Sequence, residues 1–119
     1  MNSVAFIFSN GPYGINSGRE GLESLLVISS FIKKIGIFFI SDGIFLLLVN
    51  KKHQNFMLKD FTKTFKILSL YKINELYLCI NSAEERGVFI NTKLLLNVKW
   101  LNKLKICNKL NKFDTILVF

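Results

Sequence analysis

The apolar residues of this chain follow two alternating patterns, short continuous runs and a helical spacing. Ser3–Ser9 and Ile35–Ser41 are short runs rich in Phe and Ile that end at turn-forming residues, a pattern typical of buried strands. Between them, Arg19–Lys34 carries Leu22 and Leu25 at helical spacing. This segment is expected to form an amphipathic helix.

The same alternation continues to the C-terminus. Glu75–Ile80 and Thr115–Phe119 predict two more strands, and Leu94–Trp100 predicts a weaker one. Asn102–Lys112 has the spacing of an amphipathic helix, with lysines on its outer side. Its apolar stripe is expected to consist of Leu104, Cys107 and Leu110.

Three shorter elements complete the expected order. Ile44–Val49 could be a short helix or an extension of the preceding strand, and the helix is favoured; a helix begins at Asp60, and a helical turn over 81–87 is closed by Gly87. Apolar strands that alternate with helices favour parallel pairing, with both faces of the sheet covered. The sequence therefore predicts one α/β domain spanning residues 1–119. It is expected to have three α/β/α layers and a mostly parallel sheet of about five strands.

The charge balance is strongly basic, with 16 Lys and Arg against 8 Asp and Glu. A net charge of +8 is compatible with a nucleic-acid partner. Arg is the residue best suited to bidentate phosphate and base contacts, yet 14 of the 16 cations are Lys. Lys, Asn, Ile and Phe are all written with A/T-rich codons, so we attribute most of the charge to composition.

No segment has the pattern of a membrane-spanning helix. The longest stretch of low charge, Ile35–Val49, contains Asp42 and is shorter than the roughly 18 residues that a span needs. The first residues lack the basic region of a secretory signal. Two cysteines in such a chain are expected to be free thiols in the cytoplasm, although a Cys79–Cys107 disulfide stays open.

Functional groups of parallel sheets collect at the carboxyl ends of the strands. The first such segment, 10–18, is rich in glycine, so its backbone N–H groups could hold an anion, or the glycines could simply allow turns. At the second strand end, Asp42 could bind a ribose or a partner, but the capping of the following helix is favoured. The third segment is Cys79–Arg86.

Cys79 is the candidate catalytic residue. It stands before a helical turn, where a thiol can become nucleophilic. Two observations oppose this interpretation: Glu84 and Glu85 disfavour a thiolate, and the apolar surroundings suit a cysteine that is only a small hydrophobe. Cys107 lies on the apolar stripe of the last helix and is expected to be packed in the core.

The remaining candidates predict no cofactor and no metal. His53 stands in the polar segment 50–55, and no second His or Cys-x-x-Cys motif accompanies it, so neither a zinc site nor a catalytic triad is supported. Trp100, with Lys99 and Lys103 nearby, could stack on a base, but packing at a strand end is favoured.

Several motifs occur together in a characteristic order. They are Val4–Phe8, Gly18–Leu22 (GREGL), Leu25–Leu26, Phe38–Gly43 (FFISDG), Phe65–Leu68, Leu70–Tyr71, Cys79, Arg86–Gly87 and Phe113–Ile116. On these residues the chain resembles the DsrE/DsrF-like family of small sulfur-relay proteins, over essentially its whole length. The resemblance implies a single parallel α/β/α domain, as the apolar pattern also predicts. The segment Thr92–Asn111 departs most from the family pattern.

The resemblance also implies a function. It implies a subunit, with related B and D subunits, of a heterohexameric complex that is a dimer of heterotrimers. This complex passes persulfide sulfur to a downstream carrier for the 2-thiolation of tRNA wobble uridine. The family attributes the essential persulfide to the D subunit, so an architectural role is expected here, with Cys79 as the alternative carrier. Direct tRNA binding by Lys93–Lys112 is not expected. A hydrophobic content of 50% independently favours a chain with large interfaces.

Overall fold

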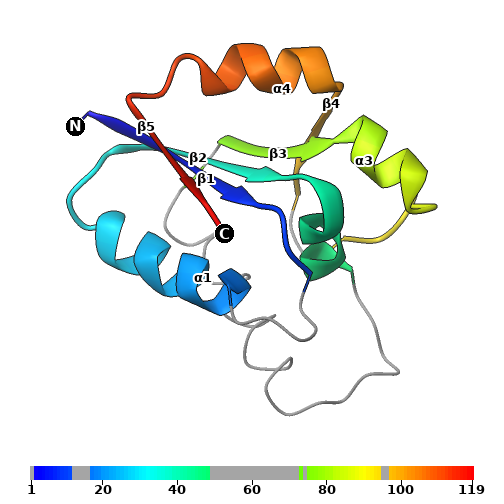
Figure 1. Cartoon of the computed structure of the whole chain (residues 1–119), viewed down its shortest axis with the longest axis horizontal. Helices are drawn as coiled ribbons and strands as arrows, with labels where there is room; N and C mark the ends of the chain where they lie inside the picture. Colours follow the sequence, from blue (N-terminus) through cyan, green and yellow to red (C-terminus); the bar gives the residue numbers. More distant parts are fainter. Residues whose placement is uncertain (1, 12–16, 49–72, 74, 95–96) are drawn as a thin grey trace.

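Five parallel strands form the centre of the molecule (Figure 1). The computed structural model describes residues 2–11, 17–48, 73, 75–94 and 97–119. The strands are β1 (Ser3–Phe8), β2 (Lys34–Phe39), β3 (Glu75–Cys79), β4 (Lys99–Leu101) and β5 (Thr115–Val118). The described helices are α1 (Ser17–Ile28), the 3-10 helix η1 (Ser41–Leu47), α3 (Ile80–Glu85) and α4 (Lys103–Leu110). The order β4-β3-β2-β1-β5 and the parallel pairing confirm the predicted α/β class.

The central strands β1, β2 and β3 are mostly apolar because both faces of the sheet are covered there. Along β1, Phe6 and Phe8 belong to a core cluster that also contains Leu25 of α1, whereas Ala5 and Ile7 belong to a second cluster with Ile106 of α4. Helix α1 lies on one side of the sheet and α4 on the other (Figure 1). This arrangement gives the three predicted layers, and it explains why continuous apolar runs replace the alternation of a one-sided sheet.

Helix α1 approaches the sheet closely at Gly21. A Cβ atom at this position would lie 2.7 Å from ring atoms of both Phe8 and Phe119, so only glycine allows the approach. The helix ends at Ile28, six residues before the predicted end at Lys34. The hydroxyl groups of Ser29 and Ser30 donate to carbonyl oxygens of the preceding turn, at 2.9 and 2.6 Å, and such side-chain bonds compete with helix continuation.

Helix α4 faces the sheet with a different stripe from the predicted one. Ile106 is buried and Leu110 is half-buried, whereas Leu104 is 71% exposed and Cys107 is exposed. The prediction that Cys107 packs in the core is therefore wrong. The residues 104, 107 and 110 have helical spacing, but so do 106, 110 and 113, and only the docking of the helix decides between the two stripes.

Other boundaries also differ from the predictions. Strand β4 covers only Lys99–Leu101, whereas Leu94, where the predicted strand began, makes an isolated antiparallel bridge with Leu48. The short helix predicted over 44–49 is η1, a 3-10 helix. The predicted polar loop 50–55 and the helix after Asp60 lie outside the described residues. Among the described residues, no helix is long and apolar enough to cross a membrane.

Candidate functional site

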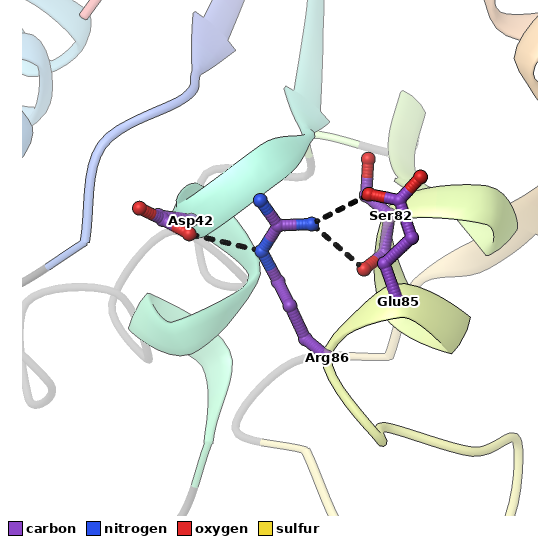
Figure 2. Close-up of polar contacts among 4 residues, drawn as sticks. All are labelled: Asp42, Ser82, Glu85 and Arg86. Carbon is purple, nitrogen blue, oxygen red and sulfur yellow. Dashed lines mark hydrogen bonds and ion pairs between the residues drawn. The ribbon is translucent and has the colours of Figure 1, made fainter.

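The carboxyl ends of β2 and β3 bring Asp42 and Arg86 together across 44 residues of sequence. Asp42 lies in the first turn of η1, which follows β2, and Arg86 is the C-cap of α3, which follows β3. Arg86 Nε donates to Asp42 Oδ1 at 2.9 Å (Figure 2). The pair therefore joins the two elements that leave neighbouring strands at the same edge of the sheet.

Arg86 has two more partners on its own helix. Its Nη1 donates to the carbonyl oxygen of Ser82 at 3.1 Å and to Glu85 Oε2 at 3.4 Å, as Figure 2 shows. The side chain of Arg86 is 21% exposed and that of Asp42 is 62% exposed. The guanidinium is thus held in place, while the carboxylate faces solvent on one side, where screening limits the energy of the pair.

Asp42 does not cap η1, contrary to the prediction. The N-cap position belongs to Ile40, and no side chain makes a capping hydrogen bond there. Asp42 already lies within the helix, and its carboxylate accepts from Arg86 instead. The preceding Ser41 has a φ of +48°, the left-handed region that is uncommon for residues other than glycine. No pattern in the sequence indicates this conformation or the Arg86 partner.

Cys79 ends β3 and is 4% exposed. It belongs to the cluster on the α4 side of the sheet, with Tyr77 and Ile106. Next to it, Asn81 Oδ1 accepts a hydrogen bond from the backbone N–H of Lys103 at 2.9 Å, which ties the start of α3 to the start of α4. The thiol is thus placed at the predicted strand end, but it is packed beneath α4 and has no described contact with Asp42 or Arg86.

Both cysteines are free, so the disulfide left open by the sequence does not form. In the glycine-rich segment, Gly11 lies beside Asp42: a Cβ atom added to Gly11 would be 3.4 Å from the Asp42 carbonyl oxygen. Residues 12–16 of that segment lie outside the described residues. Trp100 packs against the main core in β4, as favoured. His53 is also outside the described part of the chain, within which no three His, Cys, Asp or Glu residues could hold a metal ion.

The close approach of α1 through Gly21 and the position of Cys79 at the end of β3 give a physical reason for two of the motifs that suggested a family. The model of the DsrE/DsrF-like family matches residues 2–119. The chain belongs to the DsrE/DsrF-like family. This membership confirms the resemblance drawn from the sequence motifs.

Relatives within the family match over the whole chain. A protein named "Protein TusC" from Buchnera aphidicola subsp. Acyrthosiphon pisum (strain Tuc7) is 43% identical over 119 residues, with all of both chains covered. One with the same name from Klebsiella pneumoniae (strain 342) is also 43% identical, with the same coverage. The crystal structure of the ychN protein from E. coli has a TM-score of 0.80 and 18% identity, with full coverage of both chains. That structural likeness supports the fold.

Proposed function

We propose that this chain is an architectural subunit of a heterohexameric sulfur-relay complex required for the 2-thiolation of tRNA wobble uridine. Its partners are the related B and D subunits, in a dimer of heterotrimers that passes sulfur to a downstream carrier protein. Family membership and full-length relatives named "Protein TusC" support the proposal. We also propose that residues 1–119 form one domain, since every described strand belongs to a single sheet, and that the complex is cytoplasmic.

The burial of Cys79 is the observation that best supports an architectural role. A persulfide carrier must present its sulfur first to a donor and then to an acceptor, so its thiol has to be reachable by two other proteins. Cys79 is 4% exposed and packs with Ile106 of α4. Sulfur transfer at this position would require α4 to move away from the sheet.

A persulfide-carrying role for Cys79 is the alternative, favoured by its position at the carboxyl end of β3. In that reaction, the Cys79 thiolate attacks the terminal sulfur of a donor persulfide. A new S–S bond forms at Cys79 Sγ, the S–S bond of the donor breaks, and the donor cysteine leaves as a thiolate. No further oxidant or reductant is needed.

Exposed apolar side chains support the role as an assembly subunit. The side chains of Phe31, Ile90 and Leu104 are each more than 70% exposed. They lie after α1, after α3 and in α4. In an assembly subunit, the surfaces of the partners would cover such side chains.

Complementation of a strain that lacks this chain tests the proposal. We expect tRNA 2-thiouridine to be absent without the chain and to be restored fully by Cys79→Ala, as by wild type. Alanine is preferred to serine because a hydroxyl group without a partner in this apolar site would itself destabilise the fold. Cys107→Ala is the matched control, since it removes the exposed thiol.

Two outcomes contradict the proposal in different ways. Unchanged 2-thiouridine in the deletion strain would exclude the tRNA-thiolation function. A folded Cys79→Ala protein that joins the complex but fails to restore thiolation would instead support the carrier role. Mass spectrometry of the complex after treatment with a persulfide donor, in the Cys107→Ala background, then shows whether Cys79 gains one sulfur atom. We expect that it does not.

A further inference from the structure

The first turn of α4 carries charges of the unfavourable sign. Lys103 and Lys105 occupy the first and third positions of the helix, and no acidic residue is present in that turn. The N-terminus of a helix has a partial positive charge, so lysine side chains there reduce the stability of the helix. Residues that break a local rule in this way often serve a function instead.

The surrounding segment shows the same bias. Residues 93–112 contain six lysines and no Asp or Glu. Within the described part of the chain, the ion pairs are those of Arg86, so no described carboxylate neutralises Lys103 or Lys105. Lys109 differs from these two because its Nζ lies over the ring of Tyr77, 5.1 Å from the centroid, where it has a packing role.

An exposed apolar side chain stands between the two lysines. Leu104 is 71% exposed, and Cys107, one turn later, is exposed as well. Apolar residues with a charged rim are typical of a protein–protein interface.

The composition of this surface favours a protein over RNA. Arg, which makes bidentate phosphate contacts, is absent from α4. Helix α4 has no aromatic residue on which a base could stack, and the ring of Tyr77 beneath it is buried. Exposed leucine adds nothing to phosphate binding but contributes to contacts with a protein surface. A second copy of this chain would present the same lysines and be repelled.

We propose that the α4 face, formed by Lys103, Leu104 and Lys105, docks an acidic and apolar surface of another subunit of the complex. This inference rests on the proposed function and specifies the surface involved. Carboxylates of the partner pair with the two lysines, and an apolar patch covers Leu104. Docking thereby compensates for the unfavourable charges at the start of the helix.

Co-expression with the B and D subunits tests the inference with K103E/K105E. We expect at least a tenfold loss of affinity for the partner subunits, and a weakening of wild-type binding as salt rises. The thermal midpoint of the isolated full chain should rise, because acidic residues suit a helix N-terminus. A gain in stability together with a loss of binding cannot be explained by unfolding.

R19E/K33E is the matched control. It reverses two exposed cations outside α4, one of them in the first turn of α1, and changes the net charge by the same amount. We expect it to bind like wild type. Leu104→Ala provides a second, uncharged probe, and we expect it to weaken binding at least threefold without changing the thermal midpoint.

The outcomes separate this inference from the proposed function. If wild type forms no complex with the B and D subunits, the proposed function fails. If wild type forms the complex and K103E/K105E binds equally well, the α4 face is not the docking surface. A third outcome would also overturn the inference. If the wild-type complex retains bound RNA, and K103E/K105E loses this RNA but still assembles with the B and D subunits, the α4 face binds RNA instead of a protein.

Discussion

Gly43 is the position where a single methyl group should disturb the candidate site most. A Cβ at Gly43 would overlap the backbone carbonyl group of Phe8 and would lie 3.1 Å from the backbone nitrogen of Ser9. The Phe8 carbonyl is itself held in place, because it accepts a hydrogen bond from Ile40 N–H at 3.1 Å. Gly43→Ala must therefore move η1 away from the end of β1, since neither partner is a flexible side chain.

The cost can be worked out from these contacts. Overpacking that shifts the backbone typically costs about 1–3 kcal/mol, and weakening the Ile40–Phe8 hydrogen bond adds about 1 kcal/mol, so we expect a loss of about 3 kcal/mol. With an unfolding entropy of about 2.1 cal/mol/K per residue, this corresponds to a decrease in Tm of about 12 °C for a chain of this length.

Thermal unfolding followed by circular dichroism measures this decrease, and Gly11→Ala is the matched control. A Cβ at Gly11 would meet the Asp42 carbonyl oxygen at 3.4 Å, close to ordinary contact, on the same edge of the sheet. We expect Gly11→Ala to stay within about 2 °C of wild type. A Gly43→Ala protein that unfolds at the same temperature as the Gly11→Ala control would refute the steric argument.

Three further predictions concern the same edge and the two thiols. Arg86→Ala should destabilise the chain by about 0.5–1 kcal/mol. A double-mutant cycle with Asp42→Ala, measured by chemical denaturation, should show a coupling energy of about 0.5 kcal/mol, because the Asp42 carboxylate is largely exposed. A coupling energy of zero would exclude the ion pair. Gly87→Ala should cost about 1 kcal/mol in the same assay although open space surrounds it, because φ is +71°, and an unchanged midpoint would contradict this. A thiol reagent should modify Cys107 in the native protein and Cys79 only after unfolding, which mass spectrometry distinguishes; equal rates would show that α4 does not protect Cys79.

The predicted elements depend on short-range signals, which explains how well they agree with the structure. The continuous apolar run of β1 indicates that this strand is buried on both faces of the sheet. Gly87 ends α3 because it adopts a positive φ, which favours glycine. Boundaries were less accurate where side chains compete with the backbone, as Ser29 and Ser30 do at the end of α1. The strand-end rule located Cys79 correctly in the fold but carried no information on its burial.

The sequence by itself determined the parallel α/β class and the order of the described elements, because periodicity and turn residues act within a few positions of the chain, and its motifs indicated the family. The tertiary structure decided which stripe of α4 faces the sheet, and it thereby buried Ile106 and exposed Leu104 and Cys107. It also paired Asp42 with Arg86 and packed Cys79 beneath a helix that begins 24 positions later. These features depend on how separate elements dock, and several dockings satisfy the same local pattern.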